Sequence, residues 1–314
     1  MAPSQLTRRS LLLGGAALLG GSGLAACSPV TEPVLPELIL ATGPPGAVYR
    51  EIGTALVDEL SKYLPRTNVR TVQTGASVEN LSLLAAGRAH LGFVSLDAML
   101  SRQSAPVQGV SAVGRLYDSF LHLVVPESSS LRTVKDLSGR RVSVGAAGSG
   151  TEYTVERLRR VSGISFNEVR LNQAESARQL EQGMIDAFFT LTGIPTPAIL
   201  DVMTRVKIRL VEMNDEAHDM AEAEPSSYVP ATIPKTTYTY LAPCRTLSVP
   251  NVLVTRDDLP DNVVRTVTET VFTKADTIAK DHAEARRINR STGIATGPVP
   301  LHPGAAAWFR QFKR

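Results

Sequence analysis

The sequence predicts an α/β fold of two similar lobes, each with a parallel-rich sheet, and a hinged ligand cleft between them. Two observations carry this prediction. The order strand, glycine turn, helix, strand, helix, glycine, strand occurs twice, with corresponding glycines and tyrosines 104 residues apart. Two long apolar segments, 120–125 and 247–255, are suited to cross between the lobes.

Composition and charge are those of a folded protein with a nearly neutral surface. Of its 314 residues, 43% are hydrophobic and 20% are charged, and the formal net charge is +3. Removing Arg8 and Arg9 with the N-terminal segment leaves 31 basic and 30 acidic side chains. Such a surface gives no reason to expect nucleic acid as a partner.

The N-terminus predicts export. Residues 7–12 (Thr-Arg-Arg-Ser-Leu-Leu) fit the twin-arginine export pattern, and an uncharged run with five glycines follows over 11–26. This run is too short and too rich in glycine for a comfortable membrane span. Leu13 stands where a lysine often follows the twin arginines, so twin-arginine and general secretory export both stay open.

The export segment ends in a lipid-attachment pattern. Residues 24–27 (Leu-Ala-Ala-Cys) resemble a bacterial lipobox, in which Cys27 is acylated and becomes the first mature residue. We therefore expect a signal peptide over 1–26 and a lipid-anchored tether over 27–36; the alternative is an uncleaved N-terminal anchor. With Cys27 acylated, Cys244 has no partner for an intrachain disulfide.

The first copy of the repeated unit begins with a buried strand at 38–41 (Leu-Ile-Leu-Ala). The turn 42–46 (Thr-Gly-Pro-Pro-Gly) follows, and then a helix with Ile52, Leu56 and Leu60 on one face. A second helix ends at Gly87, which suits a helix C-terminus, and the next strand covers 90–94.

The second copy has the same plan. A strand at 141–144 leads into the glycine-rich turn 145–151 and a helix with Val155, Leu158 and Val161 on its buried face. The following helix ends at Gly183, and a strand begins at Asp186.

The crossing segments set the expected lobe boundaries. Lobe 1 is expected over 37–124, lobe 2 over 125–244, and a return to lobe 1 over 245–314. A long helix is expected from Asp261 to Ala279, with Pro260 in its first turn.

The glycine turns predict anion sites. A turn that opens a helix presents backbone N–H groups, with the positive end of the helix dipole behind them. Gly148, Ser149, Gly150 and Thr151 therefore suit a carboxylate without any charged side chain. Because such turns lie at the carboxyl ends of parallel strands, both are expected to face the cleft.

Motifs of rival chemistry are absent from the sequence. The glycine spacing at 145–150 is not the dinucleotide fingerprint, and no lysine follows to make a phosphate-binding loop. Ser149 lacks the flanking glycines of a nucleophile elbow. The five histidines show no spacing typical of a metal site. We expect no enzyme activity, no metal and no cofactor.

Segments along the chain resemble the TAXI family, the extracytoplasmic solute receptors of TRAP transporters. They begin with Thr-Gly-Pro-Pro-Gly-Ala-Val-Tyr at 42–49 and Thr-Gly-Ala-Ser-Val-Glu-Asn-Leu at 74–81. Further similar segments are 142–151, 185–189, 193–197, 228–234 and 300–306.

The resemblance implies a type II periplasmic binding protein fold that closes over a small carboxylate such as glutamate or 2-oxoglutarate. It implies a TRAP-type membrane permease as partner and a place at the outer face of a bacterial cell membrane. Besides the second turn, the candidate ligand residues are Gly43, Gly46, Tyr49, Ser77, Asn80 and Gly193. Tyr49 is the favoured contact, because its ring would cover a ligand and its hydroxyl would orient it.

Two features limit what is carried over from the family. Pro44 and Pro45 replace part of the glycine run that is usual there, and proline removes N–H donors. Ser77 also suits a helix N-cap with Asn80 three residues later, so helix capping and ligand contact are both open for this pair.

Two other functions use the same sequence features. A sensory receptor of this fold would present its ligand state to a membrane kinase, and none of these residues separates it from a transport receptor. An exported enzyme is disfavoured by the missing motifs.

Overall fold

The computed structural model describes residues 35–100 and 107–311. The predicted signal peptide, Cys27 and most of the tether lie outside the described residues. The described residues all belong to one compact unit.

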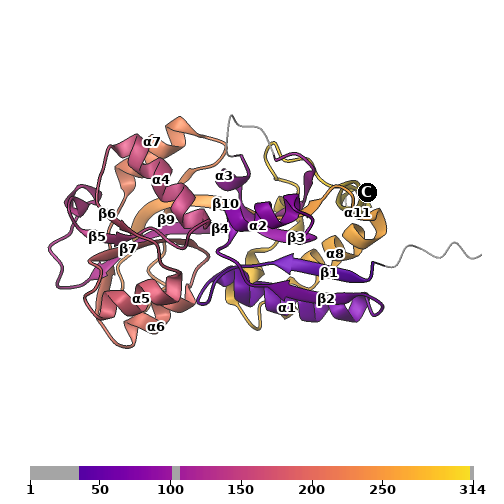
Figure 1. Cartoon of the computed structure of the whole chain (residues 1–314), viewed down its shortest axis with the longest axis horizontal. Helices are drawn as coiled ribbons and strands as arrows, with labels where there is room; N and C mark the ends of the chain where they lie inside the picture. Colours follow the sequence, from indigo (N-terminus) through magenta and orange to yellow (C-terminus); the bar gives the residue numbers. More distant parts are fainter. Residues whose placement is uncertain (1–34, 101–106, 312–314) are drawn as a thin grey trace, which may run out of the picture. The chain divides into compact units, whose positions relative to one another are not determined.

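The strands of the described residues form one mixed, ten-stranded sheet (Figure 1). They are β1 Glu37–Ala41, β2 Asn68–Val72, β3 Leu91–Ser95, β4 Val110–Pro126, β5 Arg141–Ser143, β6 Asn167–Val169, β7 Ala187–Thr192, β8 Ile208–Leu210, β9 Val229–Ile233 and β10 Cys244–Arg256. The order is β2-β1-β3-β10-β4-β7-β5-β6, with β8 paired to β4 and β9 paired to β10.

The predicted duplication is confirmed by the strand pairing. We call residues 37–95 the first repeat and residues 141–192 the second repeat. In the first repeat, β1 lies between β2 and β3 and is parallel to both; in the second, β5 lies between β6 and β7 and is parallel to both. Each parallel connection carries a helix, as this type of pairing requires.

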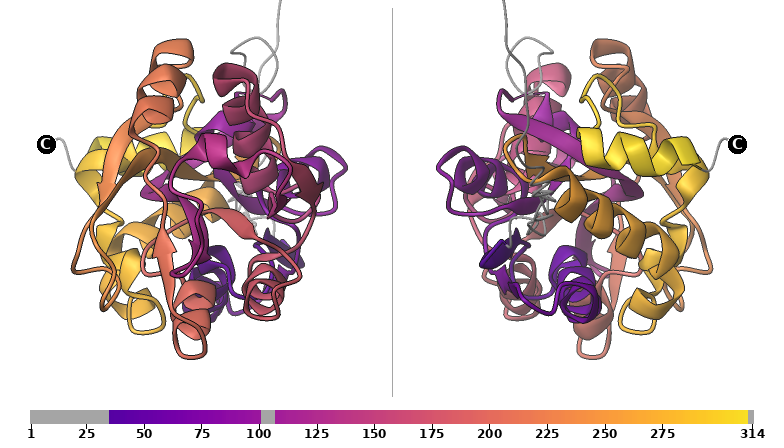
Figure 2. Two further views of the ribbon diagram at one scale, coloured as in Figure 1. Left: turned by 90° about the vertical axis from the view of Figure 1, so that its left-hand side faces the viewer. Right: turned by 90° about the vertical axis from the view of Figure 1, so that its right-hand side faces the viewer.

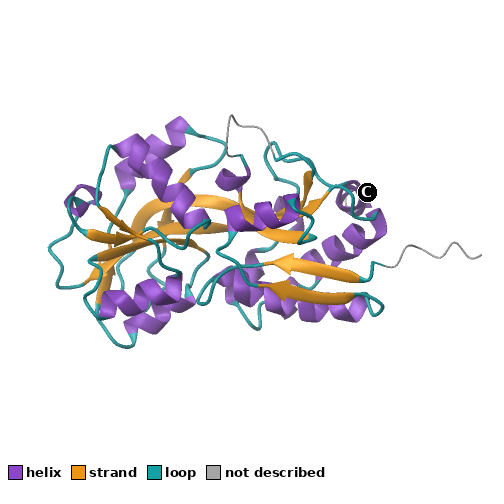
Figure 3. Cartoon of the chain, in the orientation of Figure 1, coloured by secondary structure: helices purple, strands orange, loops and turns teal. Residues whose placement is uncertain are grey.

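The two long strands join the repeats. β4 and β10 are antiparallel to each other, with Arg256 opposite Val110 and Ser248 opposite Phe120. On its other side β10 pairs with β3, and β4 pairs with β7. Figure 3 shows these strands between the two groups of shorter ones. The predicted strand at 120–125 is thus the end of a longer one.

The α-helices are α1 Val48–Tyr63, α2 Ser77–Ala85, α3 Leu96–Met99, α4 Gly150–Ser162, α5 Gln173–Glu181, α6 Pro197–Met203, α7 Asn214–Ala223, α8 Asp261–Thr273, α9 Ala275–Ile278, α10 Arg290–Gly293 and α11 Pro303–Gln311. Short 3₁₀ helices cover Val134–Leu137 (η1) and Ala283–Arg287 (η2). Among the described helices, none is long and apolar enough to span a bilayer.

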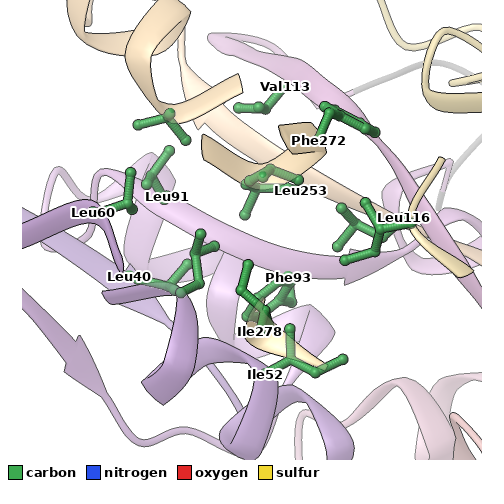
Figure 4. Close-up of a cluster of buried hydrophobic side chains, with 14 of the residues drawn as sticks. Leu40, Ile52, Leu60, Leu91, Phe93, Val113, Leu116, Leu253, Phe272 and Ile278 are labelled. Atoms are coloured by element: carbon green, nitrogen blue, oxygen red, sulfur yellow. The ribbon is translucent and has the colours of Figure 1, made fainter. Parts of the chain in front are cut away.

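Helices cover both faces of the sheet (Figure 2). Over the strands of the first repeat, α1, α8 and α11 pack on one face around Leu40, Phe93 and Leu253, as Figure 4 shows for part of this cluster. Helices α2 and α3 pack on the opposite face around Val94 and Val252. Over the strands of the second repeat, α4 and α7 cover one face and α5 and α6 cover the other.

Several local expectations were wrong. Val161 is 39% exposed, because α4 ends one residue later and its last turn lies beyond the core that Val155 and Leu158 enter. The long helix predicted from Asp261 breaks at Lys274 (φ −110°, ψ 13°), and α9 then carries the buried Ile278 back to the core of α8. Pro260 is the N-cap of α8 and does not lie in its first turn. The proposed lobe boundaries at 124 and 244 stay predictions.

Candidate functional site

A small cavity is lined by residues of both repeats. Its volume is about 30 Å³. It is lined by Pro44, Ala47, Val48, Tyr49, Gly75, Ala76, Ser77, Ser95, Ser119, Gly145, Ala146, Ser149, Gly150, Thr151, Asn172, Gln173, Leu191, Thr192 and Gly193. One water molecule needs roughly 10–15 Å³ on this measure. The cavity therefore holds very few atoms unless its walls move apart.

Helix N-termini surround this cavity. The first residues of α1, α2, α4 and α5 all line it, namely Val48, Ser77, Gly150 and Gln173. At α4 and α5 a side-chain cap occupies one N–H group: Ser149 accepts from Glu152, and Asn172 accepts from Glu175. At α1 and α2 the N-cap residue is an alanine, which makes no side-chain cap. The positive ends of these helix dipoles all favour negative charge in the cavity.

The described lining contains no Asp, Glu, Lys, Arg or His. Its polar side chains are hydroxyls and amides, including Ser77, Ser119 and Thr192. A cavity built from neutral donors at helix N-termini binds an anion without a counter-charge and without an ion pair to desolvate.

The turn of the second repeat opens α4 as predicted, and its role as an anion site stays a prediction. The amide of Gly148 already donates to Oε2 of Glu152 at 2.7 Å. Gly145 (φ +96°) and Gly148 (φ +71°) adopt backbone conformations that favour glycine. The oxygen of Ser149 caps α4 by accepting from the amide of Glu152 at 3.0 Å. The Thr151 hydroxyl oxygen accepts from the backbone amide of Leu191 at 3.0 Å. This bond fixes the Thr151 oxygen and leaves its proton to donate.

The turn of the second repeat also contacts the start of α2 and the end of β3 in the first repeat, and the sequence did not indicate this. The carbonyl oxygen of Gly148 accepts from the amides of Val78 and Glu79, both at 3.1 Å. A Cβ on Gly150 would lie 2.9 Å from the hydroxyl oxygens of both Ser77 and Ser95. Glycine is therefore required here for close approach between the repeats. We call these contacts, from Ser77, Val78, Glu79 and Ser95 to Gly148 and Gly150, the seam.

The turn of the first repeat contributes less than predicted. Neither Gly43 nor Gly46 lines the cavity. Gly46 (φ +78°) instead packs against α5 and α6, where a Cβ would lie 3.5 Å from Cβ of Ala174 and 3.1 Å from Cβ of Ala198. Both glycines thus allow the backbone conformation and the close packing of the turn.

Tyr49 lines the cavity, but its hydroxyl is already engaged. It donates to Oδ1 of Asn251 on β10, whose amide nitrogen donates to the Tyr117 carbonyl at 3.0 Å and to the Ser119 hydroxyl at 2.8 Å. Burial raises the pKa of Tyr49 well above its usual range, so the phenol stays neutral. The ring is therefore a fixed wall of the cavity.

Ser77 lines the cavity, whereas Asn80 does not. Asn80 is fully buried and donates to the carbonyls of Thr42 and Phe93, both at 2.8 Å, which ties β1 to β3. The predicted capping pair is wrong, because the N-cap of α2 is Ala76 (φ +104°) and Ser77 accepts instead from the Ser95 amide at 3.0 Å.

Gly193 forms part of the cavity wall and is held from behind by a buried network. The Thr196 hydroxyl donates to the Gly193 carbonyl at 3.0 Å, and the Thr196 amide donates to the Tyr238 hydroxyl at 3.1 Å. That hydroxyl also lies 3.0 Å from Nε2 of His122. Burial lowers the pKa of His122 to about 4, so the ring is neutral at physiological pH.

Sequence reasoning missed several lining residues. Asn172 and Gln173 open α5, and an asparagine three residues before Glu175 is a helix-start signal that was available. Ser95, Ser119 and Thr192 lie on strands, where no local pattern marks them as lining a cavity.

Comparison with protein-family models shows which family the chain belongs to. Residues 40–311 match the model of the NMT1-like family. The chain belongs to the NMT1-like family. The narrower resemblance to TAXI receptors stays a prediction for this NMT1-like protein.

Solved structures share the fold at low identity. A protein of Bordetella bronchiseptica matches with a TM-score of 0.58 and 14% identity, over 89% of this chain and 98% of that one. A periplasmic transporter matches with a TM-score of 0.54 and 13% identity, over 88% and 92%. A putative L-cystine ABC transporter protein of Listeria monocytogenes matches with a TM-score of 0.50 and 16% identity, over 82% and 98%. The fold is the type II periplasmic binding protein fold, as predicted.

Proposed function

We propose that this NMT1-like protein is an extracytoplasmic solute-binding lipoprotein that captures a small carboxylate for a membrane permease. The observation that carries the proposal is the cavity itself. It lies at the N-termini of α1, α2, α4 and α5, and its described lining has no charged side chain. That combination favours a small anion over a cation or a neutral apolar ligand.

The second repeat supplies the best-defined anion contacts. Backbone N–H groups at Gly150 and Thr151 begin α4, and the Thr151 hydroxyl is held by Leu191 with its proton available for the ligand. Gly193 and the hydroxyls of Ser119 and Thr192 form the facing wall. A carboxylate such as that of glutamate or 2-oxoglutarate fits this set of donors.

Ligand capture requires the cavity to enlarge. Pockets for ordinary small molecules measure roughly 300–1,000 Å³, whereas this one measures about 30 Å³. We infer that the two repeats separate at the seam, with bending in β4 and β10, the long strands that join them. Ligand that binds the closed form better shifts the population towards closure.

Partner and location follow from the N-terminus and the family. Acylation at Cys27 would hold the protein at the outer face of the cell membrane, beside its permease. The resemblance to TAXI receptors favours a TRAP-type permease. The similar Listeria protein is a putative L-cystine ABC transporter. An ABC permease is therefore the alternative to a TRAP-type permease as partner.

A thermal-shift screen tests the proposal. Because a ligand that binds only the folded state raises apparent stability, small carboxylates, sulfonates and amino acids are compared with their amides, in which the anionic group is neutral. We expect at least one carboxylate to raise the melting temperature while its amide does not. Stabilisation by uncharged analogues alone would contradict an anion site.

A further inference from the structure

A buried carboxylate joins the two repeats behind the cavity. Asp97, on α3 directly after the first repeat, is fully buried. Its Oδ2 accepts from the Thr154 hydroxyl of α4 at 2.6 Å and from the Tyr228 hydroxyl at 3.0 Å. Both donors come from beyond the long strand β4, 57 and 131 residues along the chain.

The same carboxylate is tied to the cavity wall. Its Oδ1 accepts from the Ala98 amide at 2.7 Å, and the hydroxyl of the lining residue Ser95 also donates to it. Thr154 lies one helical turn after Gly150, and its hydroxyl is 2.9 Å from the Gly150 carbonyl oxygen. Asp97 therefore contacts the first turn of α4 through Thr154. The backbone N–H groups of this turn face the cavity.

The side chains that hydrogen-bond to Asp97, those of Thr154, Tyr228 and Ser95, are neutral hydroxyls. The titratable groups near it are the phenols of Tyr228 and Tyr49. The charged groups nearest to Tyr228 are Arg157 and Glu224, which form an ion pair with each other at 2.6 Å. A buried carboxylate without a cation is expensive to ionise, and burial accordingly raises the pKa of Asp97 although its hydrogen-bond donors lower it.

We propose that Asp97 is the positioning residue that holds the start of α4 against the seam, and that closing the seam is coupled to protonation of this carboxylate. This inference rests on the opening at the seam proposed above but not on the identity of the ligand, so it is tested without one.

The coupling has a definite sign. In the closed form the pKa of Asp97 is raised, whereas in an opened form the carboxylate is hydrated and titrates in its ordinary range. Closure is therefore favoured below the ordinary carboxylic range and weakens as pH rises towards the closed-state pKa. One linked proton changes the closing equilibrium by at most about tenfold per pH unit.

Amide hydrogen exchange of the full chain in detergent solution tests the proposal without a ligand. The amides of Val78 and Glu79 are protected only while they donate to Gly148. After correction for intrinsic exchange, we expect their protection to fall by up to about tenfold per unit as pH rises from about 4. In Asp97→Asn the side chain cannot ionise. We therefore expect protection of these amides to be independent of pH and close to the wild-type value at acidic pH.

The matched control is Glu59→Gln. Glu59 is also buried, but it lies on α1, pairs with Lys62 and does not line the cavity. In Glu59→Gln, the pH dependence of protection at the Val78 and Glu79 amides should equal that of the wild type. Identical profiles for the wild type and Asp97→Asn, or a flat wild-type profile, would overturn the proposal.

Thr154→Val is a second test if Asp97→Asn does not fold. Losing this donor raises the closed-state pKa of Asp97 further, so protection should be close to wild type at the acid end and fall over a wider pH range. A uniform loss of protection at every pH would mean that Thr154 and Asp97 only add packing and hydrogen bonding, and the proton coupling would be rejected.

Discussion

The amide of Glu79 donates to the carbonyl of Gly148 at 3.1 Å, which joins the first turn of α2 to the turn that precedes α4. The glycine turn of the second repeat therefore contacts the first repeat as well as the cavity. Its glycines serve two purposes, because the turn needs positive φ at Gly148 and close approach at Gly150.

Gly150→Ala should weaken both closure and ligand binding. The added Cβ would lie 2.9 Å from the hydroxyls of Ser77 and Ser95, so the seam must shift. Overpacking of this kind costs about 1–3 kcal/mol, and we expect affinity to fall about tenfold or more. Gly139→Ala is the control, because a Cβ there meets no described atom within 4 Å, although Gly139 has a positive φ (+72°) and Gly150 does not. It should lower stability without changing affinity; equal affinities for the two variants would show that the seam does not matter for binding.

A pair of buried tyrosines tests the network behind Gly193. Tyr238→Phe removes a hydroxyl that contacts Thr196 and His122, and should lower the free energy of unfolding by about 1–3 kcal/mol. Tyr117→Phe removes a buried hydroxyl with no hydrogen-bond partner among the described residues, and should be neutral or stabilising. Denaturant unfolding of both variants checks this contrast, and similar losses for both would contradict it.

Glu284 should make stability depend on pH. It is 2% exposed, and burial raises its pKa to about 7 even though Arg287 opposes the shift. Since the folded-state pKa exceeds the unfolded one, stability is highest below the ordinary carboxylic range and is lost as pH rises to about 7.

Glu284→Gln should remove that dependence. At pH 8 we expect it to be more stable than the wild type by up to about 3 kcal/mol, with little difference near pH 4. Asp136→Asn should behave in the opposite sense, because hydrogen bonds from the backbone amides of Arg132 and Thr133 lower the pKa of Asp136. Urea unfolding at the two pH values measures this effect. The same difference in free energy of unfolding between the wild type and Glu284→Gln at both pH values would contradict a raised pKa of Glu284.

Cys27 should carry lipid in the mature protein. The lipobox pattern at 24–27 predicts that mass spectrometry of the membrane-bound form finds an acylated Cys27 as its first residue. Cys27→Ser should release soluble protein or leave the precursor unprocessed. An intact Met1 or Ala2 on the membrane-bound protein would contradict this processing.

Local patterns predicted the repeated units well. The spacing of Ile52, Leu56 and Leu60 predicted α1, and the glycine-rich turn at 145–151 predicted the start of α4. Such features depend on residues close together in sequence, so one chain is enough to infer them.

Contacts between distant segments were not predictable in the same way. The seam joins Glu79 to Gly148, and the buried acid Asp97 meets Tyr228; neither pairing leaves a periodic signal. The sequence left helix capping and ligand contact as alternatives for Asn80. In the structure Asn80 is buried between β1 and β3, and its hydrogen bonds to both segments could not be inferred from local sequence.

The most direct test of the central claim is isothermal titration of the wild type and Thr151→Ala with the carboxylate from the screen and with its uncharged amide. The account predicts that the wild type binds the carboxylate and not the amide, and that Thr151→Ala binds the carboxylate about ten- to a hundredfold more weakly. Thr268→Ala, at another buried threonine on α8, should bind like the wild type. Unchanged affinity in Thr151→Ala, or equal binding of the amide, would contradict an anion site at the start of α4.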